Sequence, residues 1–299
     1  MDIAGILSLE DKEVFEVFRL EAKSRGRKIF SDNENYMFIK GSDRICLVAH
    51  IDTVSGEWVD GTRKPVKKKL VEKYGIIRAY TERGKRPTIL GADDRAGCYG
   101  LLDIMKSDDR PSILLTNYEE CGGVGVGVFT NETDLWKNTD FFVELDRAGC
   151  NEYVQYNENT QEVHDFMAKF AISNGGYGSY SDIATISKVT KIPSVNLAIG
   201  YRSQHSDREY LDLAVMSMAI KKAKLIIHRY CKDKPQLGRI KERPIPPTRS
   251  SVYDWNSRQR KVDSEEIKCA ECGAADGHHY RSCPDYDNKT GNLFNWEEK

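Results

Sequence analysis

The sequence lacks any apolar run of the length that a membrane-spanning helix requires. Residues 1–11 have no basic lead and only a brief apolar patch, so no secretory signal peptide is expected there. Net charge is almost absent as well, because 45 Lys and Arg residues oppose 46 Asp and Glu residues. The overall charge therefore indicates no class of partner, and we expect a cytoplasmic protein without a membrane partner.

Cysteine is present, but a disulfide framework is not expected. The eight cysteines lie in a chain of cytosolic character, where metal binding or inert burial is the usual role of a thiol. Internal repeats are also absent. With 299 residues, of which 39% are apolar, the chain is long enough to bury one large α/β core and to carry a small appendage.

Apolar runs alternate with helical patterns up to about residue 230. Continuous apolar runs predict strands buried on both faces at 45–49, 112–117, 141–145 and 194–199. Helical spacing of apolar residues predicts helices at 9–24, 96–105 and 211–230. Residues 163–172 fit either a helix or a strand. This alternation predicts a three-layer α/β/α fold with a mixed, mostly parallel central sheet.

Histidine and acidic residues stand at the ends of these runs, which is where ligands bind in open α/β sheets. Each residue alone has an ordinary structural role, such as a strand-end cap or surface charge, but the complete set indicates a metal site. Nitrogen and oxygen ligands of this kind suit zinc, and a shared carboxylate lets two metals lie about 3.5–4 Å apart. The set consists of His50, Asp94, Glu119, Glu120, Asp146 and His205.

Asp52 and one of the two adjacent glutamates have supporting roles that follow from their positions in the sequence. Asp52 lies two residues after His50, so in an extended segment it faces the same side and can fix the tautomer of the imidazole. Glu119 and Glu120 are neighbours at a strand end and would point differently. One would face a metal, and the other would face a bound water as a general base.

Four motifs in this order resemble the co-catalytic di-zinc exopeptidases, a group that includes single-domain zinc aminopeptidases, tripeptidase T and glutamyl aminopeptidases. The resemblance covers about residues 9–231. It implies zinc-dependent hydrolysis of short peptides, by an aminopeptidase or a di/tripeptidase, through a water that two zinc ions activate. The motifs are His50-Ile-Asp52-Thr-Val54, Gly91-Ala-Asp-Asp94-Arg-Ala-Gly97, Glu119-Glu120-Cys-Gly-Gly123 and the late His205.

The resemblance also implies roles for individual residues. Asp94 would bridge the two zinc ions, and the other ligands would be His50, Glu120, Asp146 and His205. Glu119 would be the general base, while Asp52 would orient His50. Members of the group have a cis peptide bond after the bridging aspartate, so one is expected between Asp94 and Arg95.

The choice between two adjacent aspartates rests on one observation. Neighbouring carboxylates repel each other, so each needs a positive partner: a helix N-terminus for one and a metal for the other. We assign the metal to Asp94, because it directly precedes Arg95-Ala96-Gly97, which open the helix. Asp93 is then the structural residue that caps this helix.

Two spacings depart from some relatives: the interval from Asp146 to His205 is short, and the interval from His50 to Asp94 is longer than the most compact aminopeptidases need. Residues 147–204 are too few for the separate lid and dimerisation domain that some of them insert there, which favours the compact aminopeptidase arrangement. Residues 61–86 are rich in Lys and Arg and alternate like an exposed hairpin at 70–80. This segment is either a solvated edge insertion, which we favour, or an electropositive rim for an anionic substrate end.

The last part of the chain resembles a zinc knuckle. The resemblance and composition divide the chain into a di-zinc peptidase-like catalytic domain at 1–231, a basic, Pro-containing linker at 232–262 and a tail at 263–299. Three thiolates and an imidazole form a closed structural zinc site, and His279 is an alternative to His278. Single-stranded nucleic acid or a protein contact is the expected partner of such a tail. The tail ligands are Cys269, Cys272, His278 and Cys283.

Two other functions compete with the peptidase. An amidohydrolase that deacylates N-acyl amino acids would use the same site on a different substrate. A nucleic-acid-binding protein on an inactive peptidase scaffold would use the basic segment, the linker and the tail. The complete ligand set favours an active hydrolase, with two co-catalytic zinc ions and one structural zinc ion in the tail.

Overall fold

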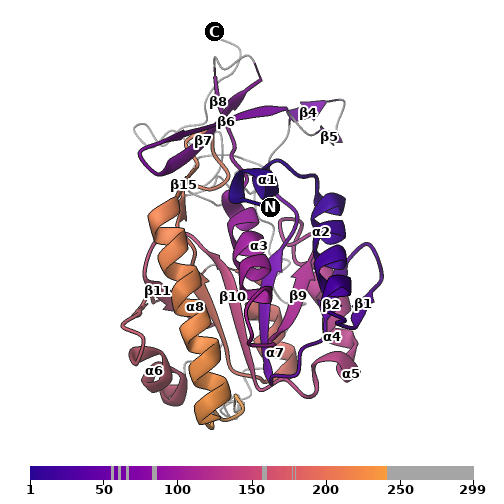
Figure 1. Ribbon diagram of the computed structural model, residues 1–299, viewed down its shortest axis with the longest axis vertical. Coiled ribbons are helices and arrows are strands. Elements are labelled where there is room, and N and C mark those ends of the chain that lie inside the picture. Colours follow the sequence, from indigo (N-terminus) through magenta and orange to yellow (C-terminus); the bar gives the residue numbers. More distant parts are fainter. Residues whose placement is uncertain are drawn as a thin grey trace, which may run out of the picture. The chain divides into compact units, whose positions relative to one another are not determined.

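Four strands of apolar sequence form the parallel centre of the main sheet in the computed structural model (Figure 1). Neighbouring strands in this centre are β9, β3, β10 and β13, and each adjacent pair is parallel. Val, Ile, Leu and Phe favour such doubly covered strands. The four strands are Ser112–Thr116, Ile45–His50, Phe141–Arg147 and Ser194–Ala198.

The structure describes residues 1–54, 67–82, 86–156, 160–176, 178 and 180–240, with the backbone of 57–59 and 62–64. Residues Met1–Glu242 form one compact unit. The predicted tail and most of the predicted linker lie outside the described residues, so both stay predictions. Within the described residues, no helix has the length and apolar character needed to cross a membrane.

Shorter strands flank the parallel centre and make the sheet mixed. The order of the eight strands is β1-β2-β9-β3-β10-β13-β11-β12. Strand β2 is antiparallel to β9, and β11 is antiparallel to β13. The flanking strands are β1 (Ile29–Ser31), β2 (Tyr36–Ile39), β11 (Glu152–Val154) and β12 (Ser173–Asn174).

Helices cover both faces of this sheet, because alternate side chains of each strand enter two separate cores. In β3, Ile45 and Leu47 belong to the larger core, whereas Cys46 and Val48 belong to the smaller one. The larger core is covered by α1 (Ile3–Leu7), α2 (Asp11–Ser24), α3 (Ala92–Met105), α6 (Gln161–Ala168) and α8 (Leu213–Asp233). The smaller core is covered by α4 (Val124–Asn131), α5 (Thr133–Trp136) and α7 (Asp182–Thr190).

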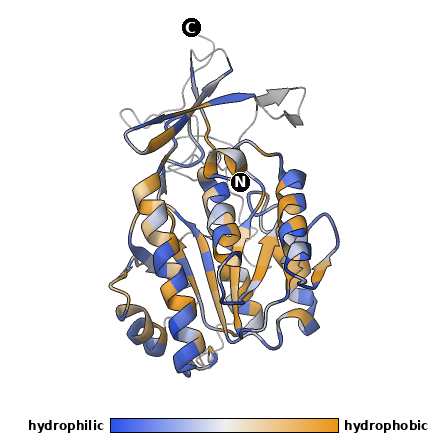
Figure 2. Cartoon of the chain, viewed as in Figure 1, coloured by the Kyte–Doolittle hydropathy of each residue, from blue (hydrophilic) through white to orange (hydrophobic). Residues whose placement is uncertain are grey.

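The predicted three-layer α/β/α fold is therefore confirmed. Apolar residues line the sheet and the inner helix faces, while the outer helix faces are polar (Figure 2). The ambiguous residues 163–172 are mainly helical. Thr160 caps that helix by accepting a hydrogen bond from the backbone N–H of Val163, 3.4 Å away, and this is a local signal that favours a helix over a strand.

The basic segment belongs to a second, smaller sheet that lies beyond the carboxyl ends of the central strands (Figure 1). Its path is β14-β15-β7-β6, and β8 pairs with β7. Most described Lys and Arg side chains of this segment are exposed, but Lys68 turns inward and is half-buried. The strands are β6 (Lys68–Lys73), β7 (Ile76–Thr81), β8 (Pro87–Thr88), β14 (Tyr201–Arg202) and β15 (Tyr210–Asp212). A separate hairpin pairs β4 (Glu57–Val59) with β5 (Thr62–Lys64).

A glycine allows α3 to approach β10 closely. A Cβ atom on Gly97 would lie 2.4 Å from the backbone carbonyl oxygen of Leu145 and 2.4 Å from Oδ1 of Asp94. Neither group can move without disturbing the strand or the start of the helix. Gly97 is therefore a packing requirement of the fold.

We expect Gly97→Ala to lower the free energy of unfolding by about 1–3 kcal/mol, because the added methyl group overpacks this contact. Urea denaturation measures the change. Gly127→Ala in α4 is the matched control, since a Cβ there meets nothing within 4 Å. That variant should be neutral or more stable by up to about 1 kcal/mol. Equal losses in both variants would contradict the packing argument.

Candidate metal centre

The ends of adjacent strands bring the predicted site residues together. His50 ends β3, Glu119 and Glu120 follow β9, and Asp146 lies near the end of β10. Because these three strands are neighbours and parallel, their carboxyl ends meet at one edge of the sheet. His205 reaches the same edge from the connection between β14 and β15.

Two groups of three side chains meet at Asp93. In the first, His50 Nε2 lies 3.1 Å from Asp93 Oδ1 and 3.5 Å from Asp146 Oδ1. In the second, His205 Nε2 lies 3.1 Å from Asp93 Oδ2 and 2.9 Å from Glu120 Oε1. We call these groups the His50 trio and the His205 trio. Each trio thus uses a different oxygen of the same Asp93 carboxylate.

The spacing within each trio fits a divalent metal. Ligand atoms that surround one zinc ion tetrahedrally at about 2.0–2.1 Å lie about 3.3 Å from one another. The four distances within the trios lie on both sides of that value. In addition, ligand atoms of His50, Asp93 and Glu120 all lie within 4.8 Å of one another, as do those of His50, Asp94 and Asp146.

Charge at the site is concentrated and poorly solvated. Burial favours the neutral form of Asp93, but hydrogen bonds from His205 and His50 outweigh it and hold the pKa of this carboxyl below its ordinary range. The same contacts, to Asp93 and to Glu120, raise the pKa of His205 to about 10. Burial, together with the charge of Asp93, raises the pKa of Asp146 to about 7. The two imidazoles thus supply positive charge beside Asp93, while Asp146 keeps a raised pKa.

Asp94, the aspartate chosen from the sequence as the bridge, has a different environment. Its Oδ1 accepts a hydrogen bond from the backbone N–H of Gly97 at 2.9 Å, and its Oδ2 accepts one from the backbone N–H of His50 at 3.3 Å. Asp94 is fully buried and its own backbone is not helical. It therefore caps the regular part of α3, the role that the sequence analysis gave to Asp93.

The expected position of the cis peptide bond is wrong by one residue. The cis bond in the described chain joins Asp93 to Asp94, not Asp94 to Arg95. Asp93 and Asp94 both have non-helical backbone angles, so regular helix geometry begins at Arg95, as the sequence analysis expected. The sequence placed the start of the helix correctly, but it does not show which peptide bond of the two adjacent aspartates is cis.

Asp52 lies beside His50, but its carboxylate mainly accepts hydrogen bonds from backbone N–H groups. Nδ1 of His50 lies 2.9 Å from the backbone carbonyl oxygen of Asp52 and 3.5 Å from its Oδ1. The two oxygens of Asp52 accept hydrogen bonds from the backbone N–H groups of Glu119 and Glu120, each at 3.1 Å. One residue thus fixes the ring of His50 and the strand end that carries both glutamates.

Glu119 faces a cleft of about 390 Å³ next to the two trios. Its carboxyl has no hydrogen-bond partner among the described residues. Burial raises the pKa of Glu119 to about 9, and the charge of Asp146 adds to this shift. A polar group that faces the cleft without a partner is positioned to exchange protons with a bound molecule. Tyr156, Tyr180, Tyr201 and Arg147 also line the cleft.

Several residues that the sequence analysis did not assign to the site support it. Tyr201, which is buried, donates a hydrogen bond from its hydroxyl to Asp146 Oδ1 at 3.0 Å. The side chain of Asn196 binds both the N–H and the carbonyl of Asp146, at 2.9 Å each. Glu209 accepts hydrogen bonds from three N–H groups at residues 91–93. No spacing rule marks these residues, because they act through backbone groups or through another side chain.

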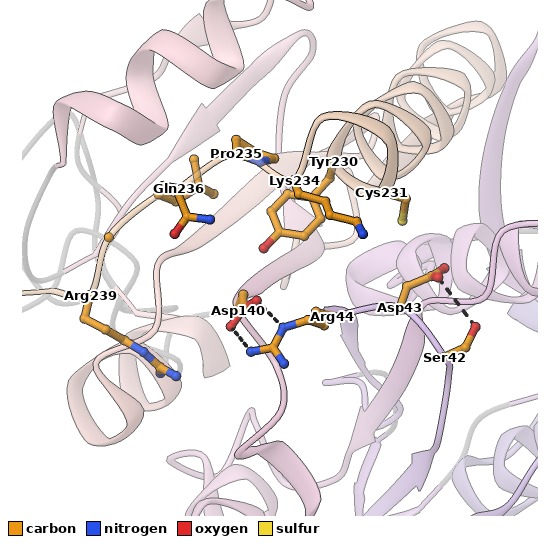
Figure 3. A pocket seen from close by; sticks show the side chains of 12 residues that line it. Ser42, Asp43, Arg44, Asp140, Tyr230, Cys231, Lys234, Pro235, Gln236 and Arg239 are labelled. Atoms are coloured by element: carbon orange, nitrogen blue, oxygen red, sulfur yellow. Dashed lines mark hydrogen bonds and ion pairs between the residues drawn. The ribbon is translucent and has the colours of Figure 1, made fainter.

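A larger cavity of about 830 Å³ lies at the amino ends of β3 and β10. Figure 3 shows the ion pair of Arg44 and Asp140 and the ring of Tyr230 in its wall. None of the predicted site residues lines it. Volume alone therefore does not locate the metal centre, which lies at the opposite ends of these strands.

Solved structures with this fold include three peptidases. An aminopeptidase from the archaeon Desulfurococcus kamchatkensis is 16% identical, with a TM-score of 0.60 over 81% of this chain and 97% of that one. A tripeptidase from Staphylococcus aureus is 14% identical, with a TM-score of 0.59 over 77% and 97% of the two chains. The aminopeptidase PepT from Bacillus cereus is 16% identical, with a TM-score of 0.54 over 75% and 96%.

No family model and no curated protein sequence matches the chain. At these levels of sequence identity, the structural likenesses show the fold alone. The chain has the mixed α/β architecture of these aminopeptidases and covers nearly their full length. What the site does must be argued from its own side chains.

We expect zinc to raise the melting temperature of chelator-treated protein, because an ion that binds only the folded state stabilises it, by about 4 kcal/mol at 1,000 times Kd. The increase should be larger at pH 8 than at pH 6. Protons compete with metal for Asp146, whose pKa is raised to about 7, and for His205, whose pKa is raised to about 10.

Differential scanning fluorimetry measures both effects. Magnesium serves as the control, because it prefers octahedral oxygen ligation and should give a smaller increase than zinc. No increase with zinc, or the same increase at both pH values, would contradict a site built from these ligands.

Proposed function

We propose that this protein is a metal-dependent exopeptidase that cleaves short peptides, as an aminopeptidase or a di/tripeptidase. One observation carries the proposal: the His50 and His205 trios share the two oxygens of Asp93 beside the unpartnered carboxyl of Glu119. Two metals and one proton-transfer group are sufficient for amide hydrolysis by an activated water. The peptidase names of the structural neighbours are consistent with it.

The proposal assigns each ligand to one of two zinc ions. The His50 trio would hold one ion through His50, Asp93 and Asp146. The His205 trio would hold the other through His205, Asp93 and Glu120. When bound, the two ions supply an activated water and polarise the amide carbonyl. Asp93 replaces Asp94 as the proposed bridge.

Glu119 would carry the proton through the reaction. It accepts the proton that the attacking water loses and delivers it to the nitrogen of the departing amine. Its backbone is held by Asp52 at 3.1 Å, so the carboxyl keeps its place at the wall of the cleft. A group that both accepts and returns a proton needs no second acid, and this suits a compact site.

The size of the cleft favours a short peptide over a folded protein. A volume of about 390 Å³ accommodates a few residues. An N-acyl amino acid would fit the same cleft, so the assay must offer both free-amine and N-blocked substrates. Faster cleavage of free-amine peptides supports the peptidase, and faster cleavage of N-blocked amides supports the amidohydrolase. The knuckle-like tail, with its structural zinc and its nucleic-acid or protein partner, remains a separate proposal.

We expect Glu119→Gln to lower kcat by at least about 100-fold, the usual contribution of a general base, while two metals stay bound. Glutamine keeps the shape of the side chain but cannot take up the proton. Metal content is measured by atomic absorption and turnover with a dipeptide. Glu132→Gln, at an exposed carboxyl next to α4, is the control and should keep full activity. Unchanged turnover in Glu119→Gln would remove the assigned role.

We also expect the two aspartates to differ in a metal-binding assay. Asp93→Asn should lower the affinity for both zinc ions, because one oxygen of each trio is affected. Asp94→Asn should keep two zinc ions with a smaller loss of affinity, because its amide oxygen still accepts from Gly97 and its NH2 group disturbs only the N–H of His50. Isothermal titration with zinc distinguishes the two. Loss of both ions in Asp94→Asn, with normal binding in Asp93→Asn, would instead identify Asp94 as the bridging residue.

A further inference from the structure

We propose that Glu209 is a positioning residue of the metal centre, which fixes the backbone that presents Asp93 and thereby sets the metal affinity of both trios. The inference rests on the proposed function, because it takes the two trios as metal ligands. It assigns to the small sheet a role that neither the motifs nor the fold indicates.

The side-chain carboxylate of Glu209 binds the Asp93 loop through backbone N–H groups of the loop. Oε2 of Glu209 accepts a hydrogen bond from the N–H of Gly91 at 2.7 Å. Oε1 accepts two, from the N–H groups of Ala92 at 2.8 Å and Asp93 at 3.2 Å. The partners are 116 to 118 positions away in the chain. Three peptide groups directly before the regular part of α3 are thus held by one carboxylate.

Lys68 holds the same loop from its other side. Its ammonium donates a hydrogen bond to the backbone carbonyl of Leu90 at 2.5 Å. Gly91, whose N–H is bound by Glu209, has φ of +72°, a conformation that side-chain-bearing residues rarely adopt. Residues 90–93 are therefore fixed by side chains from the small sheet, with Lys68 in β6 and Glu209 directly before β15.

The placement of Glu209 has an electrostatic cost that calls for a function. The side chain is 1% exposed and adds negative charge beside the carboxylates of the metal centre. If this side chain only had to accept hydrogen bonds from the loop, a neutral acceptor would do so with a smaller desolvation penalty than a carboxylate. Charge-assisted hydrogen bonds are shorter and stronger than neutral ones, so a carboxylate holds the three peptide groups more rigidly.

Rigidity matters because Asp93 must serve both trios at once. Its two oxygens lie 3.1 Å from His50 and 3.1 Å from His205, and a small rotation of the peptide would lose one contact. Glu209 also lies four residues after His205, and its own N–H donates to the carbonyl of Ser206 at 3.1 Å. One residue therefore connects the loops that carry Asp93 and His205.

The test compares the zinc affinity of Glu209→Gln with that of the wild-type protein, by competition against a chromogenic chelator without substrate. Glutamine keeps one acceptor oxygen but places an N–H donor against a backbone N–H. We expect zinc affinity to fall by about 10–100-fold, as for other residues that orient ligands. Saturating zinc should then restore most of the turnover. Wild-type zinc affinity in the folded variant would overturn the inference.

Asp140→Asn is the matched control, since it removes a carboxylate that binds Arg44 at the far ends of the strands. It should change the melting temperature but not the zinc affinity; an equal loss of affinity would overturn the inference. If Glu209→Gln does not fold, Glu209→Asp keeps the charge but is one methylene shorter. Reduced zinc affinity in that variant supports the inference and wild-type affinity overturns it.

Zinc affinity and hydrolysis, measured separately, distinguish failure of this inference from failure of the proposed function. A wild-type protein that binds two zinc ions and cleaves neither peptides nor N-blocked amides would reject the hydrolase. The affinity difference of Glu209→Gln would still stand in that case. A wild-type protein with no zinc affinity would reject both.

Discussion

Repulsion between carboxylates is the constraint on which this structure depends. Asp93, Asp146, Glu119 and Glu120 converge at one edge of the main sheet, where burial removes most of the water that would screen them. Without added positive charge, the protein raises the pKa of Asp146 to about 7 and that of Glu119 to about 9, chiefly through burial. Two divalent cations would offset the same repulsion directly.

The site residues are held in position by other side chains, which form hydrogen bonds with backbone groups. Asp52 holds the segment of Glu119 and Glu120, Asn196 holds the backbone of Asp146, and Asp94 holds the backbone of His50. Each of these contacts fixes the backbone of a strand end or a loop, and that backbone positions the ligand side chain that it carries. This arrangement lets strongly repelling groups stay close, because their backbones cannot move apart.

The sequence predicts the main sheet because buried parallel strands need continuous apolar runs, and few other structures produce that pattern. It also predicts which side chains gather, since the ends of such strands share an edge. It does not distinguish Asp93 from Asp94, because both are aspartates directly before the regular helix and only the folded backbone gives them different surroundings. Glu209 cannot be found this way at all. Its partners are peptide N–H groups, and every residue except proline has one.

The pairing of β7 with β15 also affects the order in which parts of the site become available during synthesis. Leu211 in β15 pairs with Ile77 in β7, so the small sheet closes only when a late segment returns to an early one. Proteins are synthesised from the N-terminus at about 5–20 residues per second. A ribosome-bound chain that has not yet exposed β15 therefore holds His50, Asp93 and Asp146 without His205. In such a nascent chain the residues of the His50 trio are therefore synthesised before the His205 trio is complete.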